Sequence, residues 1–245
     1  KSLRPLPVVK EKEGEVFDAF TDPEQRYRQR YVDLIVNPQV RETFLQRTRL
    51  TNAMRSFLNE KGYLEVEAPV LQPLYGGAMA RPFKTHHHAL DTTLYLRIAN
   101  ELYLKRLIVG GFSGVYEFAK DFRNEGMSRF HNPEFTQMEL YVAYRDYFWM
   151  MSLTEEMIEH IAVSLHGAPE INSGETTLSF QRTWKRFTMY EAIEHFTGTD
   201  ISGFGEQEMR TFAEKEGIHT DATMGRGRLI DELFGSRCEP FLIQP

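Results

Sequence analysis

The sequence predicts an α+β fold, and three observations support this class. Helix-like and strand-like patterns occur without the regular alternation of strand and helix that a doubly wound parallel sheet requires. Residues 115–125 and 135–144 each alternate between polar and apolar side chains, as two paired antiparallel strands do. Short helical segments separated by glycine-rich turns follow over residues 190–235, and they predict a small helical insertion.

The first third of the chain predicts a linker, a helix and a strand. Residues 1–39 are rich in proline and charge, and we expect them to dock on the body as a linker. Apolar residues at three- and four-residue spacing predict an amphipathic helix over residues 40–60 that Gly62 can end. Its expected apolar stripe is Phe44, Leu50, Met54, Phe57 and Leu58. The alternating segment 63–69 predicts a strand that Pro69 ends.

The remaining elements predict one core domain over residues 40–189, to which the chain returns at 236–245. We expect, in order, a loop at 75–83, a strand at 94–99, a helix at 100–109 and a helix at 152–167. Ser152 or Thr154 is the expected cap of the last helix.

Composition excludes several classes of protein. The 245 residues are 41% hydrophobic and 26% charged, which is ordinary for a soluble globular protein. No stretch reaches the roughly 18 apolar residues that span a bilayer, and residues 1–14 lack the apolar segment of a secretory signal. The single cysteine, Cys238, fits a reducing cytoplasm, and we expect it to be buried or partly buried. A net charge of -6 argues against a surface built wholly for nucleic acid but allows a local basic pocket.

The two predicted strands place charge and aromatic surface on one common face. Strand alternation puts Glu117, Asp121, Arg123 and Glu125 on one side of the first strand. It puts Phe135, Gln137, Glu139 and Tyr141 on one side of the second. Two interpretations are open: a solvated face of an antiparallel sheet, or a ligand site. The mixture of donors, acceptors and rings favours a site, as does the ten-residue connecting loop from Gly126 to Phe135.

These segments resemble a known family. FRNE at 122–125 and FTQME at 135–139 resemble motif 2 of the class II aminoacyl-tRNA synthetases, within residues 115–144. KGYLEVEAPVLQP, within residues 58–73, is similar to motif 1, with Pro69 as its terminal proline. The segments YGGAMARPFKT, RIANELYLKRL and RNEGMSRFHNPEFTQMELY resemble the bacterial lysyl-tRNA synthetases.

The resemblance implies a fold, a reaction and partners. The expected fold is an antiparallel sheet of about six strands flanked by helices, dimerised through motif 1. The expected reaction joins L-lysine and ATP into lysyl-adenylate and pyrophosphate, and then transfers lysine to tRNA(Lys) in protein synthesis. A cytoplasmic homodimer with no membrane segment is implied.

The resemblance also implies the ATP-binding residues. Arg123 matches the arginine whose guanidinium bonds the α-phosphate and the lysine carboxylate together, which makes it the expected catalytic residue. Glu125 matches the glutamate near the adenine amino group, and Phe135 matches the ring on which adenine stacks. Loop residues expected over the triphosphate and the tRNA end are Arg129, His131 and Asn132. The alternatives are that Arg123 pairs with Asp121 or Glu117 in the sheet, and that the loop residues are merely solvated.

The implied lysine pocket combines acids with a tyrosine and a glycine. Glu101 and Glu139 match the two acidic residues of the pocket, Tyr141 matches its tyrosine, and Arg123 also contacts the lysine. Acids are needed because an ammonium taken from water requires an opposite charge and hydrogen bonds. Gly77 matches a backbone contact near the lysine amino group, where a glycine lets a ligand approach closely. Glu101 can also be an ordinary first-turn helix acid.

The sequence departs from the family in what it lacks. The glycine-rich motif 3 and the acidic residues that hold Mg²⁺ do not occur before Pro245, and neither does the anticodon-binding barrel. We therefore expect a fragment that is weakly active or inactive by itself, and no metal site. Three adjacent histidines at 86–88 do not change this, because neighbours on a strand point to opposite faces.

Two further interpretations of the function stay open. One is a lysyltransferase paralogue that attaches lysine to a translation factor, and the other is a non-catalytic dimerising module of the same fold. Aspartate and asparagine relatives share motif 2, but their side chains should not need the two acids at Glu101 and Glu139.

Overall fold

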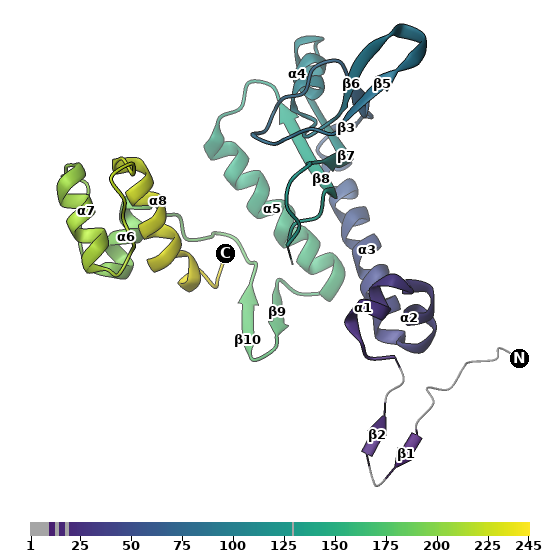
Figure 1. Ribbon diagram of the computed structural model, residues 1–245, viewed down its shortest axis with the longest axis horizontal. Helices are drawn as coiled ribbons and strands as arrows, with labels where there is room; N and C mark the ends of the chain where they lie inside the picture. The colour runs from purple at the N-terminus through teal and green to yellow at the C-terminus, as the bar shows by residue number, and fades with distance from the viewer. Residues whose placement is uncertain (1–9, 13–14, 18–19, 129) are drawn as a thin grey trace, which may run out of the picture. The chain divides into compact units, whose positions relative to one another are not determined.

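Two three-stranded sheets and their helices make up the first of two units into which the chain divides, residues 1–150 and 151–245. The computed structural model describes residues 10–12, 15–17, 20–128 and 130–245 (Figure 1). The strands of the first unit are β1 (Lys10–Lys12), β2 (Glu15–Phe17), β3 (Leu64–Glu65), β4 (Leu71–Gln72), β5 (Lys84–His87), β6 (Thr92–Leu96), β7 (Gly114–Phe122) and β8 (Glu134–Val142). Its helices are α1 (Pro23–Arg28), α2 (Arg30–Val36), α3 (Pro38–Glu60), the short η1 (His88–Leu90) and α4 (Glu101–Val109), and α5 (Tyr147–His166) begins in it.

The long hairpin β7–β8 confirms the predicted pair of strands. Its antiparallel register places Glu117 opposite Glu139 and Asp121 opposite Phe135, so these side chains share one face. β7 ends at Phe122, but the Arg123 N–H still donates to the Pro133 carbonyl at 2.9 Å. The pairing therefore carries the polar face of the hairpin one residue beyond the strand.

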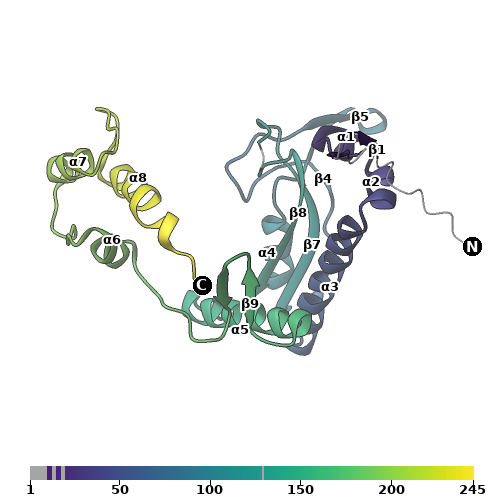
Figure 2. The ribbon, with the colours of Figure 1, turned by 90° about the horizontal axis from the view of Figure 1, so that it is seen from below.

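The sheet that the family resemblance implies is divided in the structure. Instead of one sheet of about six strands, the described residues form two three-stranded sheets, ordered β3-β7-β8 and β4-β6-β5, besides the two-stranded pairs β1-β2 and β9-β10 (residues 170–179). The predicted strand at 63–69 shrinks to Leu64–Glu65 and pairs with β7 in parallel. Helix α4 packs on β7 and β8 (Figure 2), and α3 packs against β3. The α+β class is thus confirmed, with one parallel pair among antiparallel ones.

Two helix predictions need correction. The long helix α3 begins at Pro38, and only the end of its predicted stripe is buried: Phe44 is 48% exposed and Leu50 40% exposed. α5 begins at Tyr147, five residues before the expected cap Ser152. The physical reason for the earlier start is Asp146, whose carboxylate accepts a hydrogen bond from the Trp149 N–H at 2.8 Å.

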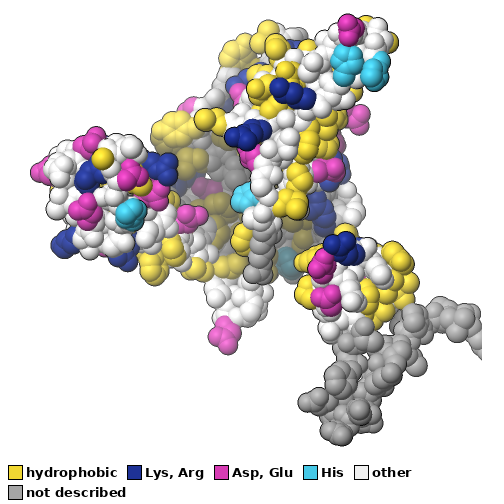
Figure 3. Space-filling model, in the orientation of Figure 1, with side chains coloured by type: hydrophobic (Ala, Val, Ile, Leu, Met, Phe, Trp, Pro, Cys, Tyr) yellow, Lys and Arg dark blue, Asp and Glu magenta, His cyan; other side chains and the backbone are white. Residues whose placement is uncertain are grey.

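The predicted linker contains two short helices and a buried ion-pair cluster. Asp33 on α2 is fully buried, and its carboxylate accepts hydrogen bonds from the side chains of Arg26, Arg30 and Asn37. Burial alone would raise the pKa of Asp33, but the Asn37 and Arg26 hydrogen bonds and the Arg26 and Arg30 charges outweigh it and lower the pKa. Tyr27 and Phe44 stay exposed, although their ring centres lie 5.1 and 5.9 Å from the Arg30 guanidinium carbon. Figure 3 shows hydrophobic side chains on the surface of this part of the chain.

The second unit continues α5 and adds a hairpin and a helical group. Strands β9 (Glu170–Ser173) and β10 (Thr176–Ser179) pair in an antiparallel hairpin. The helices are α6 (Met189–Thr197), α7 (Glu206–Lys215), α8 (Arg226–Arg237) and the short η2 (Glu239–Phe241). Thr188 and Glu191 form a capping box at the start of α6.

An ordinary apolar core holds the helical group together. Its buried members are Ala192, Ile193, Ile201, Met209, Phe212, Ala213, Leu229, Ile230, Leu233 and Cys238. The expected burial of Cys238 is confirmed, and burial raises the pKa of its thiol. The predicted helical insertion thus has its own core, while its proposed limits remain a prediction. In the part of the chain that the structure describes, every helix is too short or too polar for a membrane span.

Candidate active site

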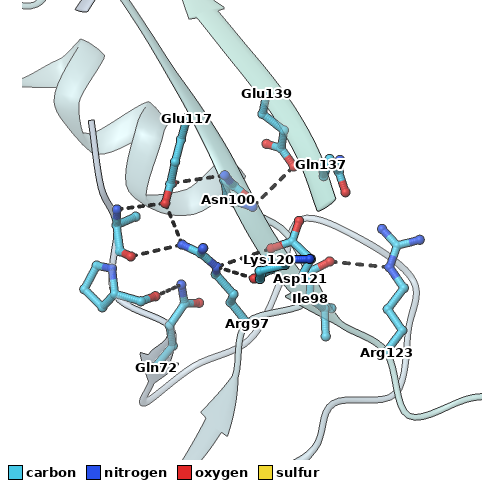
Figure 4. A network of polar contacts seen from close by, with 12 residues as sticks. Gln72, Arg97, Ile98, Asn100, Glu117, Lys120, Asp121, Arg123, Gln137 and Glu139 are labelled. Carbon is cyan, nitrogen blue, oxygen red and sulfur yellow. Dashed lines mark hydrogen bonds and ion pairs between the residues drawn. The ribbon is translucent and has the colours of Figure 1, made fainter. Parts of the chain in front are cut away.

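The polar face of the β7–β8 hairpin contains a carboxylate held by three donors. Glu139 Oε1 accepts from the Asn100 N–H at 3.2 Å and from Gln137 Nε2 at 3.0 Å. Its Oε2 accepts from the Tyr141 hydroxyl at 3.0 Å. These bonds come from β8 itself and from the start of α4, so they fix the carboxylate in one orientation. Figure 4 shows Glu139 with Asn100 and Gln137.

Tyr141 lies between the two acids expected in the pocket. Burial raises its pKa, and the neighbouring charges of Glu139 and Glu101 raise it further. The hydroxyl therefore stays protonated at neutral pH and acts as a donor. Glu101 is partly exposed and pairs with Lys105 one turn later, with 2.6 Å between Oε1 and Nζ. The Lys105 ammonium also lies 5.9 Å from the centre of the Tyr141 ring, a position that sequence reasoning did not single out.

Gly77 lies so close to Glu101 that a side chain at this position would clash with it. Its φ of +88° lies in the left-handed region, and a Cβ there would meet Glu101 Cβ at 2.9 Å and Ala99 Cβ at 3.1 Å. Any larger residue would push against the helix start that carries the pocket acid. The structure thus brings Gly77, Glu101, Glu139 and Tyr141 together, as the resemblance implies.

Arg123 and Phe135 lie side by side farther along the same hairpin. The Arg123 guanidinium carbon is 5.0 Å from the centre of the Phe135 ring, and its Nε donates to the Ile98 carbonyl at 3.4 Å. Glu125 accepts from the Arg81 N–H at 3.3 Å, and the Asn124 N–H donates to the Arg81 carbonyl at 2.7 Å. The loop segment around Arg81 is therefore tied to the end of β7.

The loop between the strands carries the least constrained of the expected residues. His131 and Asn132 are exposed, and His131 Nδ1 lies 2.7 Å from the Ser128 hydroxyl oxygen. Arg129 falls outside the described residues. The structure therefore places His131 and Asn132 on an open loop, and their expected contact with a triphosphate stays a prediction.

A buried arginine that sequence reasoning missed lies beneath this face. The alternative interpretation paired Arg123 with Glu117 or Asp121, but Arg97 makes both ion pairs, at 2.7 and 3.3 Å. Arg97 Nη1 also donates to the Ala68 carbonyl at 3.0 Å, and its Nε donates to the Lys120 carbonyl at 2.9 Å. A charged residue between Leu96 and Ile98 was the available signal, because a lone arginine in an apolar strand needs buried partners.

Asp121 is the least satisfied group of this network. Its side chain is fully buried, and neither carboxylate oxygen has a hydrogen-bond donor among the described residues. Burial raises its pKa to about 6; Glu139 and Glu117 add to the rise, while Arg97 and Arg123 oppose it. Figure 4 shows Asp121 amid Arg97, Glu139 and Arg123, so both expected ligand-binding ends of the hairpin influence the same carboxyl group.

The described residues were searched for clusters of metal-binding side chains. Within residues 10–12, 15–17, 20–128 and 130–245, no three His, Cys, Asp or Glu side chains gather closely enough to hold a metal ion.

Comparison with known proteins gives the family of the chain. The family described as "tRNA synthetases class II (D, K and N)" matches residues 22–224. The lysine–tRNA ligase of Porphyromonas gingivalis is 62% identical over all 245 residues, that of Christiangramia forsetii 60%, and that of Azobacteroides pseudotrichonymphae 57%. The chain spans 42%, 43% and 49% of these three relatives, so it covers less than half of each. The family match over most of the chain shows that it belongs to the class II tRNA synthetases of the D, K and N group.

Proposed function

We propose that this chain supplies the lysine- and ATP-binding face of a lysine–tRNA ligase that acts in the cytoplasm. The observation that carries the proposal is Glu139, fixed by three donors beside Tyr141 and Glu101, on the same hairpin as Arg123 and Phe135. Free lysine carries two ammonium groups at pH 7, and the pocket offers two carboxylates. The relatives named as lysine–tRNA ligases support the same substrate.

The first step requires positioning more than proton transfer. The lysine carboxylate is already ionised at neutral pH, so one of its oxygens attacks the α-phosphorus of ATP directly. The bond to the bridging oxygen breaks, pyrophosphate leaves, and lysyl-adenylate remains. Arg123 bonds both anions and stabilises the charge that develops on the α-phosphate, while the Phe135 ring stacks on adenine.

The second step transfers lysine to tRNA(Lys). A terminal ribose hydroxyl of the tRNA attacks the carbonyl carbon of the adenylate, and AMP leaves. His131 and Asn132 stand on the exposed loop at this end of the hairpin, which supports a role in holding the triphosphate or the tRNA end. Exposed Phe44, Leu45 and Leu50 on α3 support dimerisation through the segment around motif 1.

Lysine-dependent exchange of pyrophosphate into ATP, measured on the full-length protein, tests the proposal. Replacing Glu139 with Gln should raise KM for lysine on the order of 10- to 100-fold, because a partly buried charge-assisted hydrogen bond is lost. The matched control is Glu134→Gln on the same strand, where the side chain is 58% exposed and lies 3.9 Å from Lys120. Exchange that depends on another amino acid would refute the proposal.

Two outcomes separate the alternatives. Charging of tRNA supports the ligase, whereas lysine transfer to a translation factor without charging supports the paralogue. The 245 residues alone should show weak exchange or none. Full turnover by this segment alone would contradict that expectation.

A further inference from the structure

Glu117 and Glu139 are like charges on neighbouring strands, and one residue, Asn100, donates hydrogen bonds to both. The two residues stand directly opposite each other in the register of β7 and β8. Like charges in this arrangement repel and destabilise the pair of strands. Asn100 lies between them: its Nδ2 donates to Glu117 Oε2 at 3.0 Å, and its N–H donates to Glu139 Oε1 at 3.2 Å (Figure 4).

The side chain of Asn100 bonds Glu117 instead of capping the helix that it begins. Asn100 occupies the N-cap position of α4, where asparagine ordinarily accepts a hydrogen bond from the helix backbone. Here the side chain makes no capping bond, and it is fully buried against Glu117. The Asn100 side chain thus ties the start of α4 to Glu117 on β7, and it does not cap the helix.

This tie fixes the two acids of the proposed pocket relative to each other. Glu101 is the next residue after Asn100 and the first residue of α4. Glu139 is bonded to the Asn100 backbone, and Glu117 is anchored on its other oxygen by Arg97 at 2.7 Å and the Ala68 N–H at 3.1 Å. A shift of Asn100 would move Glu101 and loosen Glu139 at once.

We infer that Asn100 is a positioning residue that sets the spacing of Glu101 and Glu139, and so the length of amino acid the pocket accepts. The inference rests on the proposed function. A diamine-like substrate must meet one carboxylate with each ammonium, so the gap between the acids selects lysine over the shorter ornithine. Asn100 acts through these acids and need not touch the substrate.

A charge-conserving swap tests this role in the full-length protein. Asn100→Asp places a third carboxylate beside Glu117, whereas the double variant Asn100→Asp/Glu117→Gln reverses the hydrogen bond and keeps the net charge. In the double variant the new amide oxygen can accept from Arg97 and Ala68, and its NH₂ can donate to the new carboxylate. Asn100→Ala removes only the side-chain bond, and Asn172→Asp on the exposed β9 strand is the matched control.

Pyrophosphate exchange is measured with lysine and with ornithine, together with KM for ATP and the melting temperature. Asn100→Ala and Asn100→Asp should raise KM for lysine on the order of 10- to 100-fold and lower the preference for lysine over ornithine. KM for ATP should change by less, and the double swap should restore the preference to within a few-fold.

Each other outcome has a definite meaning. If both single variants keep the wild-type KM for lysine and the wild-type preference, the inference is overturned. It is also overturned if KM for lysine and ATP rise together and the folded double swap restores neither. Should Asn100→Asp fail to fold, Asn100→Ala and the swap decide. A wild-type protein without lysine-dependent exchange defeats the proposed function instead, which keeps the two failures distinct.

Discussion

Asp33 and Asp121 are both fully buried, yet their surroundings drive their pKa values in opposite directions. Asp33 receives hydrogen bonds from two arginines and an asparagine, and its pKa is lowered. Asp121 has one ion pair, no hydrogen-bond donor among the described residues, and two neighbouring glutamates, and its pKa is raised to about 6. Burial therefore does not by itself say what a carboxylate does.

The difference separates a structural cluster from the proposed ligand site. A buried carboxylate that is fully paired stabilises the fold, and around Asp33 every described partner belongs to the same short segment. A buried carboxylate left without donors costs stability and persists where the surroundings serve another purpose. Asp121 lies on the hairpin face that carries Arg123, Phe135 and Glu139.

The largest expected effect comes from removing Arg97, the cation that pairs with Asp121 and Glu117. Arg97→Met leaves the buried carboxylates of Glu117 and Asp121 without their ion pair, which should cost about 3–5 kcal/mol of unfolding free energy. Arg30→Met should cost less, because Arg26 and Asn37 still bond Asp33. Urea denaturation at pH 7.5 measures the unfolding free energy of both variants. Equal losses of stability would contradict the difference drawn between the Asp33 and Asp121 sites.

A substitution at Asp121 should stabilise the protein. Because the folded state holds the Asp121 proton up to about pH 6 and the unfolded state releases it near 3.8, stability falls as pH rises between these values. Asp121→Asn removes this cost, so at pH 8 it should gain up to about 3 kcal/mol. The gain should shrink through pH 6 and vanish below pH 4. A loss of stability at pH 8 would show that Asp121 is satisfied by a partner.

The same substitution at Asp33 should have the opposite sign. The lowered pKa means that the folded state favours the ionised form, so its contribution is present above the unfolded pKa. Asp33→Asn should therefore lower the melting temperature at pH 7, and the difference from wild type should disappear as pH falls through the lowered folded pKa. Thermal melts across pH 3–8 compare the two variants directly.

The smallest expected effect is on the pH profile of lysine activation. Protonating Asp121 removes a negative charge from the surroundings of Arg97, Arg123, Glu117 and Glu139, and so weakens the attraction for a cationic substrate. In the full-length protein, kcat/KM for lysine should fall by roughly a few-fold as pH drops through 6. Asp121→Asn should flatten this step, whereas Asp33→Asn should leave it in place.

The sequence predicted the face of the hairpin better than what lies beneath it. Strand alternation alone placed Glu117 and Asp121 on the same side as Glu139, because alternation is a local property of the backbone. Arg97 escaped prediction because its partners Ala68, Glu117 and Lys120 lie 20 to 29 residues away in the chain. Asn100 was missed for two reasons. Its partner Glu117 is 17 residues away in the chain, and asparagine at the start of a helix is already explained by N-capping.

The same limit explains the errors in the helices. Spacing correctly indicated a long amphipathic helix before Gly62, but periodicity cannot say what covers its stripe, and Phe44 and Leu50 remain exposed. The early start of α5 depended on a capping bond to the Asp146 carboxylate, six residues before the expected serine.

A crystal structure with a non-hydrolysable lysyl-adenylate analogue, such as the sulfamoyl ester mimic, tests the central claim most directly. The account predicts one ammonium at Glu139 and Tyr141, the other at Glu101 beside Gly77, the phosphate mimic at Arg123 and adenine against Phe135. An analogue bound away from the β7–β8 hairpin, or bound there with both ammonium groups distant from Glu101 and Glu139, would contradict it.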